Sequence, residues 1–242
     1  MDNVASAAPN QSPLRLGSGA MFDRIAHRYD LLNRVLSLGM DGGWRRQAVR
    51  ALALAPGDTA LDVATGTGDV AIRIAQSHPT VCVTGIDPSS AMLGVAARKL
   101  LRDALGMRVT LATGDCQHLP FESRHFDGSI IAFGIRNVPD RARGVREMAR
   151  VTRAGRPVVI LELAEPPSGL LGSVARTYVH QVVPRVGAWL SGAREYRYLQ
   201  ESVAAFPSPP EFAAVMAANQ VRVRSVISLG FGACTLYVGE SQ

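Results

Sequence analysis

The segment LDVATGTGD, residues 61–69, constrains the fold of this 242-residue chain more than any other part of the sequence. A short apolar run leads into Gly66 and Gly68, and a helical pattern begins directly after them. Glycines at such a turn let the backbone approach a ligand closely, and the helix that follows offers unpaired N–H groups to an anionic group. The segment therefore predicts a ligand site where a strand passes into a helix. Because Gly66, Gly68 and Ala71 also satisfy the dinucleotide pattern G-x-G-x-x-A, an NAD(P)-dependent oxidoreductase stays open at this point.

Apolar runs and helical stretches alternate through the middle of the chain. The runs cover residues 60–63, 81–86, 109–112, 128–132 and 158–163, and the helical stretches cover residues 70–76, 91–102 and 143–151. This alternation predicts a parallel sheet with helices on both faces. Near the end of the chain, a helical stretch at 211–219 precedes two strand-like runs, 221–227 and 233–238, joined by a glycine-bearing loop. Such a hairpin adds an antiparallel strand to the sheet.

Charge, cysteine and histidine usage argue against several classes of protein. The net charge is +6, and Lys99 is the only lysine among 26 basic residues, which are spread along the chain, so we expect no nucleic-acid partner. The three cysteines lie far apart and the five histidines lack metal-binding spacing, so we expect a reducing compartment and no metal. No apolar run approaches the ~18 residues that span a bilayer, and the first 20 residues carry no secretory pattern, which predicts a cytoplasmic protein.

Two aspartates follow successive apolar runs. Asp87 ends the second run, about twenty residues after the glycine-rich turn, where a carboxylate can bind both ribose hydroxyls of NAD or of S-adenosylmethionine. The alternative is that Asp87 only caps the helix that follows it. Asp115 comes just after the third run, where S-adenosylmethionine-dependent methyltransferases hold the adenine amino group. This second carboxylate favours a methyltransferase over an oxidoreductase, which would also need a proton donor such as the Tyr-x-x-x-Lys pair that the chain lacks.

Several further segments, in the right order, carry a resemblance to a known family. They are YDLLNRVLS at 29–37 with Trp44-Arg45-Arg46 beyond it, FGIRNV at 133–138, the stretch from Arg150 to Glu162, and YRYLxxS at 196–202. With these segments, the chain from about Met21 to Gly239 resembles the C-methyltransferases of ubiquinone and menaquinone biosynthesis. Asp41 stands where that family usually has histidine, and Arg153-Ala154-Gly155-Arg156 replaces a basic-Pro-Gly-Gly turn. The position of Asp41 bears on the identity of the substrate.

The resemblance implies a fold and a domain organisation. We expect an α/β protein with the class I S-adenosylmethionine-dependent methyltransferase fold, a Rossmann-like, mostly parallel seven-stranded sheet with a C-terminal antiparallel strand. Residues 1–17 would form a flexible arm, and residues 18–242 a single methyltransferase domain. Within it we expect a helical cap at 18–54, a cofactor-binding core at 57–163, and substrate-side helices with a closing hairpin at 168–242. An apolar stripe at 170–189 is either a face that packs on the core or a lipid-binding lid.

The resemblance also implies a reaction and a set of site residues. The reaction is methylation of a ring carbon of a prenylated quinol, demethylmenaquinol or a polyprenyl-methoxybenzoquinol, by S-adenosyl-L-methionine. Arg136 would be catalytic, stabilising phenolate charge, and Tyr29 and Asn137 would bind the substrate. The predicted cofactor-binding residues are Asp62, Gly66, Thr67, Gly68, Asp87, Asp115, Cys116 and Ala132.

Alternatives stay open for several of these residues and for the protein. Arg136 could instead be a structural ion pair with an acid such as Asp140, and Tyr29 and Asn137 could be structural polar residues. The protein could methylate another small aromatic metabolite, or bind the cofactor without catalysis. Peripheral membrane contact at the inner face and a homodimer are also open. Four arginines on one helical face form either a solvated surface or a contact with anionic lipid; they are Arg143, Arg146, Arg150 and Arg153.

Overall fold

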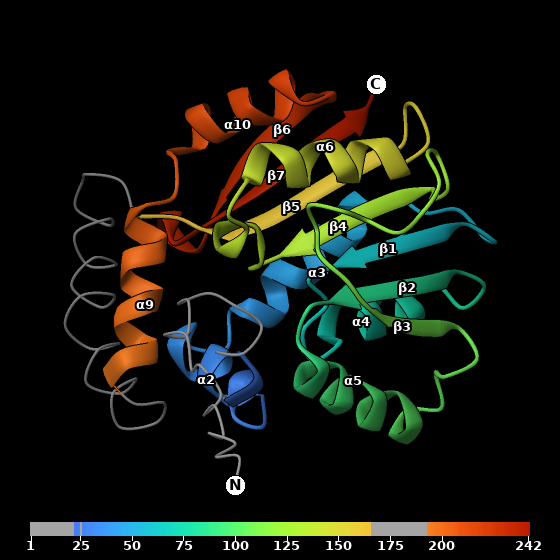
Figure 1. The fold of residues 1–242 in the computed structure, drawn as a ribbon, viewed down its shortest axis with the longest axis horizontal. Helices are drawn as coiled ribbons and strands as arrows, with labels where there is room; N and C mark the ends of the chain where they lie inside the picture. Colours follow the sequence, from blue (N-terminus) through green and yellow to red (C-terminus); the bar gives the residue numbers. More distant parts are fainter. Residues whose placement is uncertain (1–21, 25, 166–192) are drawn as a thin grey trace, which may run out of the picture.

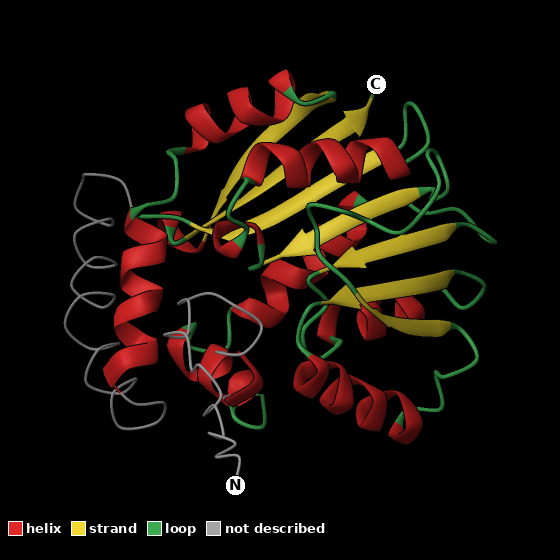
Figure 2. Ribbon diagram, in the orientation of Figure 1, coloured by secondary structure: helices red, strands yellow, loops and turns green. Residues whose placement is uncertain are grey.

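The computed structural model describes residues 22–24, 26–165 and 193–242. These residues form a seven-stranded sheet with helices on both faces (Figures 1 and 2). The strands are β1 Thr59–Val63, β2 Cys82–Asp87, β3 Val109–Thr113, β4 Gly128–Ala132, β5 Pro157–Leu163, β6 Val221–Leu229 and β7 Cys234–Ser241. The helices are α2 Tyr29–Leu36, α3 Asp41–Ala51, α4 Asp69–Ser77, α5 Ser90–Arg102, α6 Arg141–Val151, α9 Ala193–Ala204 and α10 Pro209–Ala218. Two 3-10 turns are η1 Ile135–Asn137 and η3 Gly230–Gly232.

The order of the strands places the ends of β1 and β4 side by side at the centre of the sheet. The order is β3-β2-β1-β4-β5-β7-β6, and β1 pairs in parallel with both β2 and β4. Only β7 runs antiparallel, pairing with β5 on one side and β6 on the other. After β1, the chain adds β2 and β3 on one side of β1 and then adds β4 on the other side. The carboxyl ends of β1 and β4 therefore lie at a topological switch point, where ligands of open α/β sheets bind. The predicted fold class is confirmed.

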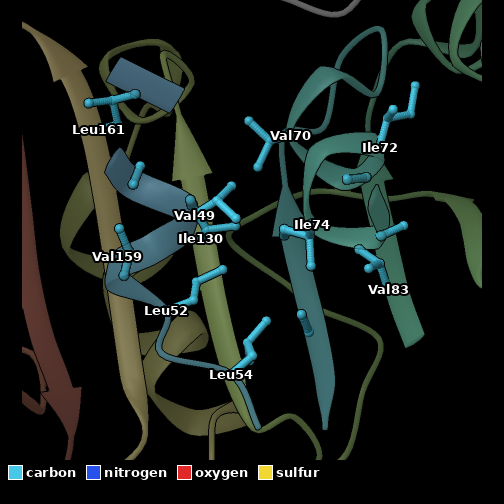
Figure 3. Close-up of a cluster of buried hydrophobic side chains, with 14 of the residues drawn as sticks. Val49, Leu52, Leu54, Val70, Ile72, Ile74, Val83, Ile130, Val159 and Leu161 are labelled. Atoms are coloured by element: carbon cyan, nitrogen blue, oxygen red, sulfur yellow. The ribbon is translucent and has the colours of Figure 1, made fainter. Parts of the chain in front are cut away.

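Two apolar clusters hold the helices on the two faces of the sheet. One cluster joins α3, α4 and α5 to the strands. Figure 3 shows Val49 and Leu52 of α3 beside Ile130 of β4 and Val159 of β5, while Val70 and Ile74 of α4 face the neighbouring strands. The other cluster joins α6 and α10 to the opposite face. The central strands are apolar throughout because both of their faces are covered.

The predicted elements agree with the structure to within a few residues. The run predicted at 128–132 is β4 itself, and the helix predicted at 70–76 is α4 with one residue more at each end. The cap predicted at 18–54 contains α2 and α3, separated by a turn in which Leu38 and Gly39 have positive φ. The arm at 1–17 and the apolar stripe at 170–189 lie outside the described residues, and the division of the chain into arm and domain stays a prediction. In the part of the chain that the structure describes, no helix is long and apolar enough to cross a membrane.

Candidate active site

The glycine-rich turn between β1 and α4 has the backbone conformation that the sequence predicts. Gly66 and Gly68 both have positive φ, +55° and +83°. A Cβ atom at Gly68 would lie 3.0 Å from the Cβ of Ala96, so glycine lets α4 begin close against α5. A Cβ at Gly66 would meet nothing nearer than the Ala64 carbonyl oxygen at 4.0 Å. The space beside Gly66 is therefore open, as a ligand that approaches this backbone requires.

Asp87 ties the turn to the end of the second strand. Its Oδ2 atom accepts a hydrogen bond of 2.8 Å from the Gly66 N–H, and its Oδ1 atom accepts one of 2.8 Å from the Ser89 N–H. Burial raises the pKa of this carboxyl, and the two N–H donors oppose that shift. The interpretation of Asp87 as only a helix cap is wrong, because the cap of α5 is Ser89, whose hydroxyl accepts from the Met92 N–H at 3.1 Å. A carboxylate has about four acceptor positions, so Asp87 keeps capacity for two ribose hydroxyls.

Asp62 lies one strand away and is buried within β1. Its Oδ2 atom accepts hydrogen bonds from the Thr65 hydroxyl at 2.6 Å and from the Ala71 N–H at 3.0 Å. Burial raises the pKa of Asp62 from 3.8 to about 7, although both hydrogen bonds lower it. These contacts make Asp62 the residue that joins the strand, the turn and the first turn of α4. A direct contact between Asp62 and the cofactor stays a prediction.

The remaining predicted cofactor residues lie at the same edge of the sheet. Asp115 is exposed after β3 and accepts from the Gln117 N–H at 2.9 Å. Cys116 is buried, and burial raises the pKa of its thiol to about 12, so it stays protonated. Ala132 ends β4 and is half-buried. The structure thus brings these positions to the carboxyl ends of neighbouring parallel strands.

The segment around α2 reaches across to the cofactor side through two aspartates that the sequence analysis did not single out. Asp30 accepts a hydrogen bond of 2.5 Å from the Thr67 hydroxyl and lies 2.6 Å from the Lys99 ammonium, which is also 2.6 Å from Asp69. Asp23 accepts from the Ser89 hydroxyl at 2.6 Å. The signal for Asp30 was available, since it belongs to the YDLLNRVLS segment that carries the resemblance.

Arg136 is buried and pairs with Glu162 of β5. Its Nη1 atom donates to Glu162 Oε1 at 2.8 Å and to the Phe133 carbonyl at 2.5 Å, and its backbone N–H donates to Glu162 Oε2 at 3.1 Å. The proposed alternative partner was wrong: Asp140 instead caps α6 by accepting from the Arg143 N–H at 2.9 Å. Burial lowers the pKa of Arg136, but the Glu162 carboxylate together with Tyr29 and Tyr198 outweighs burial, so the pKa of the guanidinium lies above its usual value.

Two tyrosines from distant parts of the chain act on this guanidinium, and one of them also contacts Asn137. Tyr29 of α2 and Tyr198 of α9 both interact electrostatically with Arg136. The Tyr198 hydroxyl donates to Asn137 Oδ1 at 2.8 Å. In Figure 1, α2 and α9 lie beyond the carboxyl ends of the parallel strands, so residues far apart in the sequence converge there. Sequence reasoning missed Glu162 and Tyr198 as site residues, although both stand in segments that carry the resemblance.

The prediction that four arginines share one helical face is wrong for one of them, because α6 ends at Val151 and Arg153 lies beyond it. All four side chains make contacts within the protein. Arg143 donates to the Gln117 carbonyl at 2.9 Å, and Arg146 donates to Asn219 Oδ1 at 2.9 Å. Arg150 pairs with Glu147, and Arg153 pairs with Asp127. These pairings favour a structural surface over a lipid contact. Among the residues described, no group of His, Cys, Asp or Glu side chains could hold a metal ion.

Solved methyltransferases share this architecture. A "SAM dependent methyltransferase" from Aquifex aeolicus has a TM-score of 0.60 at 17% identity, covering 82% of this chain and 89% of its own. Geranyl diphosphate C-methyltransferase from Streptomyces coelicolor, solved with S-adenosyl-L-homocysteine, has a TM-score of 0.61 at 15% identity, covering 82% of this chain and 78% of its own. At these identities the likeness shows the fold alone. The chain thus has the Rossmann-like fold of the S-adenosylmethionine-dependent methyltransferases.

Sequence relatives narrow this class to one family. The "Ubiquinone/menaquinone biosynthesis C-methyltransferase UbiE" of Syntrophotalea carbinolica is 47% identical over 219 residues, 90% of this chain and 92% of its own. The "Demethylmenaquinone methyltransferase" of Deinococcus radiodurans is 46% identical over 224 residues, 92% of this chain and 91% of its own. The chain belongs to the ubiE/COQ5 methyltransferase family, whose sequence profile matches residues 15–241. It is therefore a methyltransferase that uses S-adenosyl-L-methionine, and the oxidoreductase alternative is excluded.

The raised pKa of Asp62 predicts an unusual dependence of stability on pH. The folded protein holds the Asp62 proton up to about pH 7, whereas the ordinary value is 3.8, so this group favours folding at low pH and loses that contribution as the pH rises to about 7. Asp62→Asn cannot ionise. We expect its free energy of unfolding, relative to wild type, to rise by up to about 4 kcal/mol between pH 4 and pH 8. Urea unfolding at a series of pH values measures this difference.

A matched control is Asp103→Asn. The hydrogen bond from Arg102 lowers the pKa of Asp103, so the wild type should gain stability relative to this variant as the pH rises, the opposite direction. If the free energies of unfolding of wild type and Asp62→Asn changed with pH in the same way, the raised pKa of Asp62 would be contradicted.

Proposed function

We propose that the protein methylates a ring carbon of a prenylated quinol in respiratory quinone biosynthesis, with demethylmenaquinol or a polyprenyl-methoxybenzoquinol as substrate. Family membership supports this proposal, because relatives that cover nearly the whole chain are named for ubiquinone and menaquinone biosynthesis. The observation that carries it is the buried Arg136 guanidinium, held by Glu162 directly after β4. A fixed positive charge at the carboxyl edge of the sheet suits an oxygen that becomes a phenolate during the reaction.

Each site residue has a task in this reaction. When bound, S-adenosyl-L-methionine supplies an electrophilic methyl group that already carries a positive charge on its sulfur. Asp87 would hold its ribose hydroxyls and Asp115 its adenine amino group, while Gly66 lets the backbone come close. On the substrate side, the quinol O–H would lose its proton to solvent, which makes the ortho carbon nucleophilic. As that carbon takes the methyl group from the sulfur, its own hydrogen would leave as a proton and the oxygen would be protonated again, so one proton is released for each methyl group transferred. Arg136 stabilises the negative oxygen, and it acts by charge rather than as a base because its pKa is raised.

Binding of the cofactor should depend on Asp87. We expect Asp87→Ala to weaken S-adenosyl-L-methionine binding by about 1.5–3 kcal/mol, the usual contribution of hydrogen bonds to a charged group. Titration calorimetry with S-adenosyl-L-methionine and S-adenosyl-L-homocysteine measures the loss. Glu122→Ala, at an exposed carboxylate in the loop before β4, is the control and should bind as wild type does. Unchanged affinity in a folded Asp87→Ala variant would refute this role.

Turnover should depend on Arg136. If its guanidinium stabilises charge that develops in the transition state, Arg136→Ala should lower kcat by about 10²–10³ and change KM less. The alanine variant also leaves Glu162 as an unpaired buried charge, which costs about 3–5 kcal/mol of stability, so Arg136→Lys is the sharper variant. Lysine keeps a positive charge beside Glu162 but lacks the planar fork, and we expect it to restore only part of kcat.

The Arg136 variants need a control of the same kind. Arg150→Lys changes an arginine that pairs with Glu147 on α6, and its kcat should stay near that of wild type. Steady-state kinetics and thermal unfolding on the same preparations separate a catalytic role of Arg136 from a purely structural one. A stable Arg136→Lys variant with wild-type turnover would remove the guanidinium fork from the mechanism.

We also propose that the protein meets its substrate at a membrane surface, because a prenylated quinol partitions into the bilayer. Arg143, Arg146, Arg150 and Arg153 all make contacts within the protein, so any electrostatic contact of these arginines with the membrane is weak. We therefore expect partial co-sedimentation with anionic vesicles at low salt and less at high salt. Equal recovery in the supernatant at both salt concentrations would contradict this.

A homodimer stays a prediction, which the sedimentation equilibrium of the purified protein decides.

A further inference from the structure

Tyr198 reaches the loop after β4 from a distant part of the chain. It lies on α9, and its half-buried hydroxyl is 2.8 Å from Asn137 Oδ1. Burial raises the pKa of the phenol, with the charges of Arg136 and Arg141 opposing that shift, so the group keeps its proton at neutral pH. Guanidinium groups have only donors and cannot accept that proton. The Asn137 carbonyl oxygen is therefore the acceptor that the described residues offer to the Tyr198 hydroxyl.

A phenol oxygen can also accept, but the positive charges of Arg136 and Arg141 act on Tyr198 and favour an orientation in which its lone pairs face them, so its proton points to Asn137. Donation from Tyr198 then sets which way the Asn137 amide faces. With Oδ1 turned to Tyr198, the amide presents its N–H donors in the other direction. A flipped amide would instead present a carbonyl oxygen, which repels a phenolate. Without Tyr198, the two orientations of a half-buried amide differ little in energy, so a fraction of the molecules would present the wrong atom.

Arg136 offers a second donor whose direction is also set. Its Nη1 atom donates to Glu162 and the Phe133 carbonyl, whereas its buried Nε–H has no hydrogen-bond partner among the residues that the structure describes. In a planar guanidinium, the Nε–H lies on the edge opposite Nη1 and forms the side-on fork that suits an oxyanion. A buried donor without a partner is costly, and a ligand oxygen would satisfy it.

We propose that Tyr198 is a positioning residue, which holds Asn137 so that Asn137 and Arg136 together form a donor-only site for the quinol oxygen. The inference rests on the proposed function and adds a residue to it. Because the oxygen gains negative charge as the ring becomes nucleophilic, the benefit of two donors is larger in the transition state than in the bound quinol. Loss of the orientation should therefore appear in kcat more than in KM.

The test is a double-mutant cycle on Tyr198 and Asn137. We expect Tyr198→Phe to lower kcat roughly five- to tenfold, the effect of one hydrogen bond, with KM changed less. In an Asn137→Ala background, Tyr198→Phe should cause no further loss, because Tyr198 acts through the amide. A role in packing alone would give the same loss in both backgrounds. Tyr237→Phe removes another phenol hydroxyl, buried on β7, and should leave kcat unchanged.

Each outcome decides the inference. Wild-type kcat in Tyr198→Phe, or equal losses with and without Asn137, overturns the positioning role while methylation of the quinol by wild type leaves the proposed function intact. A wild-type protein that does not methylate the quinol overturns both. Thermal unfolding of every variant tests whether the compared proteins are folded. We expect the phenylalanine variants to fold, because phenylalanine keeps nearly the packing volume of tyrosine.

Discussion

The buried ion pair between Arg136 and Glu162 organises the proposed substrate side of the protein. Glu162 is fully buried and accepts three hydrogen bonds, from the Arg136 side chain, the Arg136 N–H and the Leu163 N–H. A buried pair of this kind gives little net stability, since apolar residues of similar size often stabilise a core equally well. Its physical effect is to hold a positive charge at one place in a medium where an uncompensated charge could not stay. The loop after β4 takes its shape from this pair.

A second network makes the cofactor side rigid and joins it to α2. Asp62 links β1 to the start of α4, and Asp87 links β2 to the turn. Asp30 and Lys99 then connect this turn to the segment that carries Tyr29. The same region of the chain therefore contacts the cofactor turn through Asp30 and approaches Arg136 through Tyr29. This arrangement fixes the two halves of the site relative to each other, as the alignment of two reactants demands.

The sequence predicted what local pattern determines and missed what strand pairing determines. Runs of apolar residues and helical spacing located β4 and α4 within a residue, because these periodicities are properties of neighbouring residues. The alternative that Arg136 forms an ion pair named Asp140 as an example, because Asp140 is near in sequence. The acid that does pair with Arg136 is Glu162, which becomes a neighbour only through the parallel pairing of β4 with β5. Tyr198 was missed as a site residue for the same reason, since α9 is far from Asn137 in the chain.

The two halves of the site also touch directly at the switch point of the sheet. A Cβ atom at Gly134 would lie 2.7 Å from the Cβ of Ala64, so the loop after β4 packs against the turn after β1. Phe133 and Ala64 each have positive φ beside this contact, a strained conformation that close packing must hold in place. The Arg45 guanidinium lies 5.2 Å from the centre of the Phe133 ring and pairs with Asp41, the position that departs from the family pattern. Asp41 thus places a charge pair beside the Phe133 ring. The close packing of the loop after β4 on the turn after β1 therefore adds to the Asp30 network in holding the two proposed halves of the site together.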